Sequence, residues 1–566
     1  MKNFKRALKK EQENQKNLMK STHGITLIAL VITVIVMLIL AGVAISVLTD
    51  DGGLFEKTRG AAEAYENSAE KEAKQLNDLM NDIDQYISGI PVSKPITSAE
   101  LTEKTSGNWD GKVNTPKLAT GMTAVYWKAN GQEVELTSSS SKSEWNKWYS
   151  YTAQTGSTAT AGSGTSKWAN AVTKDENGNI TGYWVWIPRY EYKLTAPASG
   201  AKAGTIDVNF IPTSKPTASS GYKIPPVFTS DTNKGGWDSE LPGFWVAKYP
   251  AGYQKSTVNT SGVVQNGSDT VVYSSLKYTN PGNSYTNVLG QNLSTTNNAY
   301  ASQNISYPVF KPLTYTYNCI NIDSMYRISQ DIKNKYEFYR LSNTTDSHLM
   351  KNSEWGAVAY LAWSQYGRNA TEPNINNVNL NNKDSKNIYA VTGMTAAGTD
   401  TAHTNGSFVG NAYNTPTGQL GSTTGNITGV YDMSGCVWEY VAGYINNTSG
   451  ASERNTCGAS LMSATAKYST VYPHNSSSDS AVNNWAATNV ATRYGDAVKE
   501  TSTTDSTGWN GDASIFPYSS YPFFQRGGNY SSTAFAGLFA FDYINGRAGN
   551  VCGFRVCLVP GPGGTL

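Results

Sequence analysis

The strongest constraint on this chain is an apolar, uncharged run over residues 25–48, ITLIALVITVIVMLILAGVAISVL. A helix needs about 20 such residues to cross a bilayer, whereas the apolar part of a cleaved secretory signal has only about 7–15. Gly42 and Ala44 imitate the small residues of a signal cleavage site. The length of the run nevertheless favours a membrane-spanning anchor over a cleaved signal.

The charges on the two sides of this run differ. Asp50 and Asp51 follow it, and seven basic residues precede it: Lys2, Lys5, Arg6, Lys9, Lys10, Lys16 and Lys20. Because Lys and Arg stay on the cytoplasmic side, we expect a single-pass protein of a bacterial cytoplasmic membrane with an extracellular C-terminal body.

The junction over residues 21–28, Ser-Thr-His-Gly-Ile-Thr-Leu-Ile, resembles the motif of type IV prepilins and type II secretion pseudopilins. The resemblance implies a prepilin peptidase that cuts between Gly24 and Ile25, N-methylation of Ile25, other pilins as partners, and a place in a pilus. Those families usually carry Glu where this chain has Ala29, and that Glu offsets a terminal amine in the apolar filament core. Since an unpaired charge is costly there, Ala29 favours a minor, tip-located or merely anchored subunit.

A change of pattern after the apolar run divides the chain further. Residues 54–88 place apolar side chains at helical spacing beside many charged ones, and Pro91 and Pro95 end that helix. The predicted division is a basic leader (1–24), a transmembrane helix (25–48), a helical stalk (49–88), a linker (89–106) and an extracellular body (107–566). The expected fold class is α+β, with the transmembrane and stalk helix before a large, β-rich and loop-rich domain.

The composition of the body argues against nucleic acid as a partner. Outside residues 1–24 the chain has 38 basic and 41 acidic side chains, whereas phosphate binding needs clustered positive charge. The cysteines are odd in number and form no CxxC pair, so we expect small buried side chains, with no metal and no cofactor. They are Cys319, Cys436, Cys457, Cys552 and Cys557.

Within the body, helical patterns occur around residues 325–340 and 352–363. The aromatic stretches 183–192 and 244–253 predict strands in neighbouring places of one sheet, or else two unrelated β segments. Residues 175–179, DENGN, imitate the start of a calcium loop, but Trp186 stands at the twelfth position. We therefore expect a hairpin turn there.

Four segments follow one another in a characteristic order: HLMKNSEW at 348–355, GVYDMSGCVWEY at 429–440, RGGNY at 526–530 and GFRV at 553–556. This succession resembles the formylglycine-generating-enzyme (sulfatase-modifying factor) family, whose fold is an elaborated C-type lectin domain. We expect the aromatic residues of these segments to pack in the core. The charged residues would be costly to bury without partners, so we expect them to form ion pairs between loops rather than a catalytic carboxylate pair. These motif residues are Glu354, Trp355, Asp432, Trp438, Glu439, Arg526, Phe554 and Arg555.

The oxidase chemistry of that family relies on two copper-binding thiols after the RGG motif. Counted from Arg526, those places fall near Ser532 and Gly537, and Cys552 and Cys557 lie too far along the chain to match them. We therefore expect no enzyme. An oxidase with relocated thiols and a structural minor pilin without a ligand remain the alternatives.

Residues 526–559 resemble the variable region of ligand-binding proteins diversified by retroelements. Mutation at template adenines turns Asn codons into codons ending in C or T, which excludes Lys, Gln, Glu, Trp and Met. None of these five occurs between Asn529 and Leu566, although all occur earlier. The alternative is chance depletion in a hairpin rich in Gly and Ser.

We expect core strands over 536–541 and 553–559, and exposed loops over 530–535 and 542–552. Tyr and Phe offer rigid contact area and Ser and Asn adaptable hydrogen bonds, as in antibody paratopes. The predicted function is a pilin-like surface adhesin or receptor whose lectin-like head binds a protein or glycan. The predicted ligand-binding residues are Tyr530, Ser531, Ser532, Ala534, Phe535, Asp542, Tyr543, Ile544, Asn545, Arg547, Asn550 and Val551.

Overall fold

The computed structural model describes residues 98–105, 113–154, 164–257, 284–286, 292–294, 308–318, 320–381, 388–396, 410–447, 455, 457–475, 477–504 and 506–561. The chain divides into two units, 1–77 and 78–566, and every described residue belongs to the second. The predicted leader (1–24), transmembrane helix (25–48) and stalk (49–88) lie outside the described residues, as do Gly24 and Ile25.

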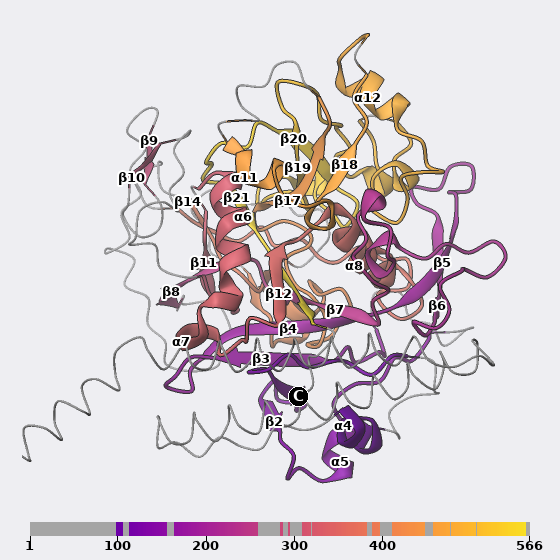
Figure 1. Ribbon diagram of the computed structural model, residues 1–566. Coiled ribbons are helices and arrows are strands. Elements are labelled where there is room, and N and C mark those ends of the chain that lie inside the picture. Colours follow the sequence, from indigo (N-terminus) through magenta and orange to yellow (C-terminus); the bar gives the residue numbers. More distant parts are fainter. Residues whose placement is uncertain are drawn as a thin grey trace, which may run out of the picture. The chain divides into compact units, whose positions relative to one another are not determined.

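An antiparallel sheet of seven strands runs through the described unit, in the spatial order β12-β22-β7-β4-β3-β1-β2. Strands β3 and β4 cross the lower part of Figure 1. The strands are β1 (Thr123–Trp127), β2 (Glu133–Leu136), β3 (Asn170–Lys174), β4 (Ile180–Pro188), β7 (Gly243–Ala247), β12 (Thr345–Leu349) and β22 (Val556–Pro560).

The two aromatic stretches form adjacent strands of this sheet. β4 pairs with β7 and sets Trp186 opposite Trp245, which confirms the prediction of neighbouring strands. Asp175 closes the β3–β4 hairpin, because its Oδ1 accepts the backbone N–H groups of Asn177 at 3.0 Å and Asn179 at 2.8 Å. The calcium-like sequence is thus a hairpin turn, as expected.

A second sheet carries the C-terminal segment. Its central strand β17 pairs in parallel with β18 and β21 and antiparallel with β19, and β19 pairs antiparallel with β20. Figure 1 shows these strands above β4 and β7. They are β17 (Trp438–Ile445), β18 (Thr470–Tyr472), β19 (Phe523–Arg526), β20 (Phe541–Ile544) and β21 (Cys552–Phe554).

Helix α8 (Asn352–Trp363) is buried at every residue. Glu354 fixes its start, because Oε2 of this side chain accepts the backbone N–H of Lys351 at 2.8 Å. α8 and α6 (Ile322–Asp331) confirm the helices predicted near 352–363 and 325–340. The other α-helices are α4 (Ser98–Thr105), α5 (Lys142–Trp145), α7 (Tyr336–Tyr339), α9 (Pro416–Gln419), α11 (Ala459–Met462) and α12 (Ala481–Ala487).

Among the described residues, the remaining strands form separate two-stranded sheets. They are β5 (Tyr190–Thr195) with β6 (Thr205–Phe210), β8 (Gly252–Thr257) with β11 (Thr314–Thr316), β9 (Ser284–Thr286) with β10 (Asn292–Ser294), β13 (Asn379–Asn381) with β14 (Ile388–Ala390), and β15 (Met394–Thr395) with β16 (Asn411–Ala412).

The predicted fold class, an α+β chain with a transmembrane and stalk helix before a lectin-like domain, is wrong. The described residues form mostly short strands and loops with few helices, and none of those helices is long and apolar enough to cross a membrane. The aromatic and Thr-rich segments favour strands, and the long helical pattern of the sequence lies outside this part of the chain. The body also begins before residue 107, because Leu101 on α4 is buried in its core.

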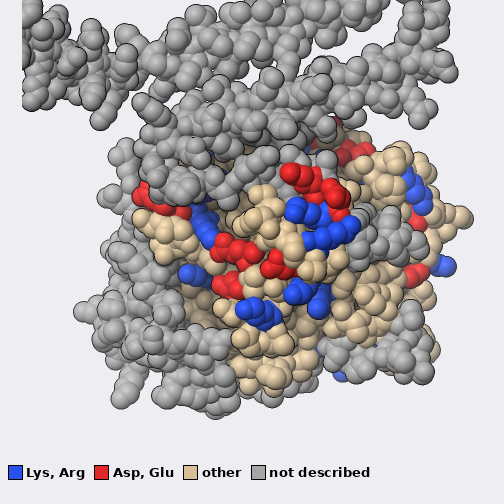
Figure 2. All heavy atoms as spheres, turned by 90° about the horizontal axis from the view of Figure 1, so that it is seen from below, with Lys and Arg blue, Asp and Glu red and all other residues tan. Residues whose placement is uncertain are grey.

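Charges of both signs share the face seen from below. Figure 2 shows Lys and Arg side chains lying among Asp and Glu side chains on that face. The described part of this face therefore has no extended patch of only positive or only negative charge.

Candidate ligand-binding surface

Arg555 lies at the centre of the motif residues and ties three segments together. Its Nη2 and Nε lie 2.7 and 3.0 Å from the two carboxylate oxygens of Glu439. The same guanidinium donates to the carbonyls of Ala247 and Tyr431, both at 2.8 Å. Arg555 and Glu439 are buried. The arrangement is a closed structural ion pair that joins β7, β17 and the segment before β17.

Trp355 and Arg526 support the C-terminal segment from the interior. Trp355 Nε1 donates to the carbonyl of Leu538 at 2.8 Å. The Arg526 guanidinium lies 5.4 Å from the Trp355 ring and donates to the carbonyl of Ala497 at 2.9 Å. Trp438 and Phe554 are buried as well. These motif residues therefore build the scaffold rather than a solvent-accessible catalytic pair.

Asp432 holds a strained turn in the same scaffold. It adopts a left-handed φ of 62° and accepts hydrogen bonds from Gly393 N at 2.7 Å and Asn376 Nδ2 at 2.8 Å. Burial raises the pKa of its carboxyl to about 7. Asn is the substitution that keeps this backbone conformation, since Asn tolerates the left-handed region and has no charge.

We expect the folding stability of the D432N variant to depend less on pH than that of the wild type. The folded-state pKa of Asp432 lies above its ordinary value of 3.8, so its neutral form stabilises the fold at low pH, and this stabilisation disappears as the pH rises from about 4 through about 7. The stability that Asp432 contributes to the fold therefore falls by about 3 kcal/mol between pH 5 and pH 8. Urea unfolding of both proteins at these two pH values measures it. Equal pH slopes for wild type and D432N would contradict the assignment.

The backbone after the RGG motif is held by groups that lie outside it. Leu538 N donates to Glu372 Oε1, and Phe539 N donates to Asp512 Oδ2 at 3.0 Å. Burial raises the pKa of both carboxyls. Tyr530 N donates to the carbonyl of Cys436 at 3.0 Å. These three bonds use main-chain atoms of the segment, and the Ser532 hydroxyl in addition accepts the backbone N–H of Asn529 at 3.0 Å.

The structure corrects two details of the predicted surface. Tyr530 is only 5% exposed and packs beside Cys436 and Val437, so it belongs to the core. The sequence predicts a strand over 536–541. Residues 536–540 instead form a buried irregular segment, and the strand β20 spans Phe541–Ile544. Edge pairing with β19, together with the parallel bridge between Ser514 and Phe541, places the strand there.

The other predicted contact residues differ in exposure. Phe535 is 62% exposed, and Ser531 and Ala534 are also exposed. Asp542 is half-buried, and burial raises the pKa of its carboxyl to about 6. The remaining residues of the set are half-buried: Ser532, Tyr543, Ile544, Asn545, Arg547, Asn550 and Val551.

Some of the predicted polar contacts are used within the fold. Asn545 Oδ1 accepts the backbone N–H of Arg547 at 3.1 Å, and the carbonyl of Asn550 accepts Asn318 Nδ2 at 2.6 Å. Ser531 and Ser532 both hydrogen-bond to Asn529. These groups shape the turns that carry the more exposed side chains.

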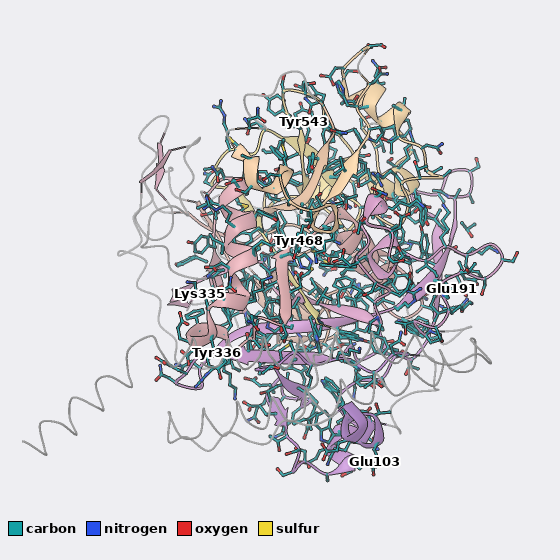
Figure 3. All side chains as sticks on the ribbon, viewed as in Figure 1. Glu103, Glu191, Lys335, Tyr336, Tyr468 and Tyr543 are labelled. Carbon is teal, nitrogen blue, oxygen red and sulfur yellow. The ribbon has the colours of Figure 1, made fainter. Side chains whose placement is uncertain are left out.

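Three half-buried tyrosines, Tyr518, Tyr521 and Tyr543, form a tyrosine cluster. Their ring centroids are 4.9 Å apart for Tyr521–Tyr543, 5.2 Å for Tyr518–Tyr543 and 5.4 Å for Tyr518–Tyr521. Figure 3 shows Tyr543 in the upper part of the view, by β19 and β20. The cluster is a rigid aromatic surface with polar hydroxyl groups.

The turn that carries Tyr518 and Tyr521 is anchored on α12. The two residues hydrogen-bond to each other through their backbones at 2.8 and 3.2 Å. The buried Asn484 donates from Nδ2 to the carbonyl of Pro517 at 3.0 Å, and Asp479 Oδ2 accepts Ser519 N at 3.0 Å. This turn therefore holds its tyrosines in fixed places.

Sequence reasoning missed Tyr518 and Tyr521. The available signal was the stretch Pro-Tyr-Ser-Ser-Tyr-Pro over residues 517–522, a turn composition with two flanking aromatics. Nothing in that stretch indicates that the turn lies against Tyr543, because the contact depends on the pairing of β19 with β20.

The thiols of the described cysteines lie in the interior. Cys436, Cys457, Cys552 and Cys557 are all buried, and Cys319 lies outside the described residues. Burial raises the pKa of the Cys552 thiol to about 12. Cys552 belongs to β21 and Cys557 to β22, strands of different sheets. Of the two positions where the oxidase resemblance would place thiols, Ser532 is half-buried and Gly537 is buried.

No family model and no curated protein matches this chain. The resemblances to prepilins, to formylglycine-generating enzymes and to retroelement-diversified proteins therefore remain predictions from the sequence motifs.

Proposed function

We propose that this protein is a non-enzymatic surface adhesin or receptor that recognises an extracellular protein or glycan through its C-terminal loops. The observation that carries the proposal is the tyrosine cluster, three contacting and partly exposed rings on a strand and an anchored turn. Tyr supplies large contact area at a small cost in conformational entropy, which is why it dominates binding surfaces.

The position of the cluster supports a role in recognition. The described chain begins at α4, and Glu103 on that helix lies at the opposite end of Figure 3 from Tyr543. The cluster and α4 therefore lie at opposite ends of the described unit. The surface location, the prepilin peptidase and the pilin partners remain predictions from the sequence.

The backbone of residues 527–540 is held by side chains from other segments of the chain, and this arrangement favours a diversified binding loop. Glu372, Asp512 and Trp355 bind main-chain groups of Leu538 and Phe539, and the exposed side chains of Ala534 and Phe535 take no part in these bonds. A loop with a fixed backbone and replaceable side chains is the arrangement that immune paratopes use. This argument supports the resemblance to retroelement-diversified variable regions.

The alternative oxidase needs an accessible thiolate pair. The thiols of Cys436, Cys552 and Cys557 are buried, and burial raises the pKa of each. A buried thiol with a raised pKa is a poor nucleophile at neutral pH. We therefore favour binding over oxidation.

The test is a screen of the purified full chain against two arrays, one of extracellular proteins and one of glycans. We expect saturable binding on one array, retained by the Y336A variant, whose exposed tyrosine lies on α7 away from the cluster. The array that responds identifies the class of ligand. Copper-dependent conversion of a cysteine peptide by the same protein, without binding on either array, would refute the proposal.

A further inference from the structure

A second group of chemically reactive side chains lies in the core, away from the tyrosine cluster. His348 on β12, Glu354 in the first turn of α8 and Cys557 on β22 are all fully buried. One ligand atom from each lies within 4.8 Å of the other two. The ligand-binding surface uses none of these three side chains.

The fold itself brings the three together. β12 pairs antiparallel with β22, and the register sets His348 directly opposite Cys557, so the two side chains lie on the same face of the sheet. The chain then turns into α8, whose Glu354 is held by the backbone N–H of Lys351. Each side chain therefore projects from a regular element with its direction fixed.

We propose that His348, Glu354 and Cys557 bind a zinc ion. One imidazole nitrogen, one carboxylate oxygen and one thiolate sulfur are the three ligand types that zinc uses in proteins. The nitrogen and sulfur disfavour calcium and magnesium, which prefer oxygen ligands. His348 Nε2 and Glu354 Oε1 lie 2.7 Å apart, and zinc bonds of about 2.0–2.1 Å at a tetrahedral angle separate such atoms by about 3.3 Å. These two atoms must therefore move apart by about 0.6 Å to hold the ion between them.

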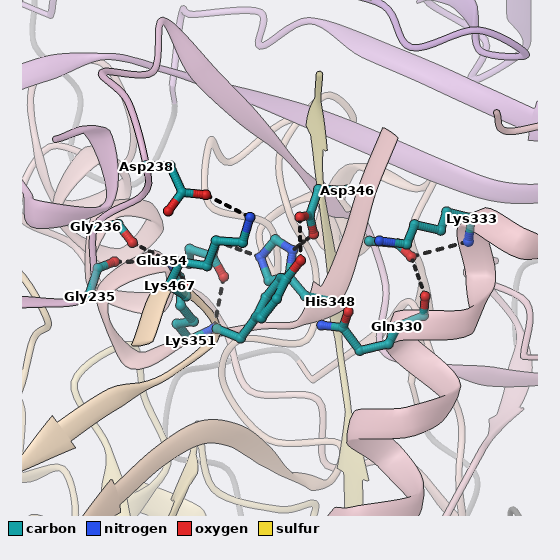
Figure 4. Close-up of polar contacts among 12 residues, drawn as sticks. Gly235, Gly236, Asp238, Gln330, Lys333, Asp346, His348, Lys351, Glu354 and Lys467 are labelled. Carbon is teal, nitrogen blue, oxygen red and sulfur yellow. Dashed lines mark hydrogen bonds and ion pairs between the residues drawn. The ribbon is translucent and has the colours of Figure 1, made fainter. Parts of the chain in front are cut away.

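The surroundings of His348 match the outer shell of a metal site. Nδ1 of His348 lies 3.3 Å from Asp346 Oδ1, and among the described residues neither buried atom has a well-formed hydrogen bond. Metal-binding imidazoles commonly direct their second nitrogen at a carboxylate, which orients the ring. Figure 4 shows Asp346 and Glu354 on opposite sides of the His348 ring. Asp346 itself accepts the hydroxyl of Tyr468 at 2.7 Å.

The ammonium group of the neighbouring Lys351 is bound by backbone carbonyls and does not occupy the space between the three proposed ligands. This ammonium donates to the carbonyls of Gly235 at 3.0 Å (Figure 4) and Lys467 at 2.8 Å. It also lies 4.0 Å from the centre of the Trp237 ring. A zinc ion, the Glu354 carboxylate and the Cys557 thiolate sum to zero charge, and Lys351 balances Asp346. The ion would join β12, β22 and α8 through three protein ligands.

Metal analysis of the purified full chain tests the site, with zinc and cobalt as probes. We expect about one equivalent of zinc per chain after gel filtration, a higher Tm than the chelator-treated protein, and a thiolate-to-cobalt charge-transfer band when cobalt replaces zinc. The C557A variant and the nearly isosteric E354Q variant should no longer retain zinc after gel filtration. C552A should keep it, because Cys552 is buried outside the cluster.

Three results would overturn the proposal: no stoichiometric metal in the wild type, a cobalt form without the sulfur band, or equal metal retention by C552A, C557A and E354Q. Each would leave His348, Glu354 and Cys557 as a buried polar cluster without a metal. If C557A fails to fold, E354Q and the cobalt spectrum of the wild type still decide the matter. Ligand binding by the tyrosine cluster is a separate measurement, so failure of one proposal leaves the other standing.

Discussion

Replacing Arg555 with methionine lowers the free energy of unfolding by about 3–5 kcal/mol. Methionine leaves Glu439 as a buried carboxylate without its partner, and it leaves the carbonyls of Ala247 and Tyr431 without a donor. Removing one partner of a buried pair costs much more than the pair contributes, because the remaining charge cannot reach water. Urea unfolding followed by tryptophan fluorescence measures the loss.

Two controls separate this effect from a general loss of charge. The E439M R555M double variant should recover part of the loss, since it removes both buried charges and leaves the two carbonyls as the remaining penalty. K174M breaks the partly exposed pair of Lys174 with Glu135 and should cost about 0–1 kcal/mol. If R555M and K174M destabilise the protein equally, Arg555 does not anchor the scaffold.

Replacing Tyr543 or Tyr521 with alanine weakens ligand binding by about 30-fold or more, once the screen has identified a ligand. Central aromatic residues of an interface typically contribute about 2 kcal/mol or more, and about 1.4 kcal/mol corresponds to a factor of ten in Kd. F535A should also weaken binding, because this ring is 62% exposed on the adjoining loop. Titration calorimetry or surface plasmon resonance measures Kd for each variant.

Stability measurements on the same variants test whether these rings bind or pack. F535A should leave Tm nearly unchanged, and Y543A should cost about 1 kcal/mol through its lost contacts with Tyr518 and Tyr521. W438A should cost about 3–5 kcal/mol, because Trp438 is buried in the core. Comparable destabilisation by Y543A, F535A and W438A would mean that the loops are packing elements, and the site assignment would be wrong.

Local sequence patterns determined several elements of this protein. The aromatic stretches around Trp186 and Trp245 predicted adjacent strands, since bulky aromatic side chains fit a pleated surface. The helical spacing at 352–363 predicted α8, and the cost of burying a charge predicted that Arg555 and Glu439 have partners. Each of these inferences depends on a residue type and its immediate neighbours.

The tertiary structure alone decided which distant residues meet. It buried Tyr530 against Cys436 and Val437, moved the expected strand from 536–541 to Phe541–Ile544, and set Tyr518 and Tyr521 against Tyr543. It also placed His348 opposite Cys557. These contacts depend on strand register and on pairings between segments far apart in the chain. A shift of one residue turns every side chain of a strand to its other face, so a local pattern in one sequence cannot specify which side chains share a site.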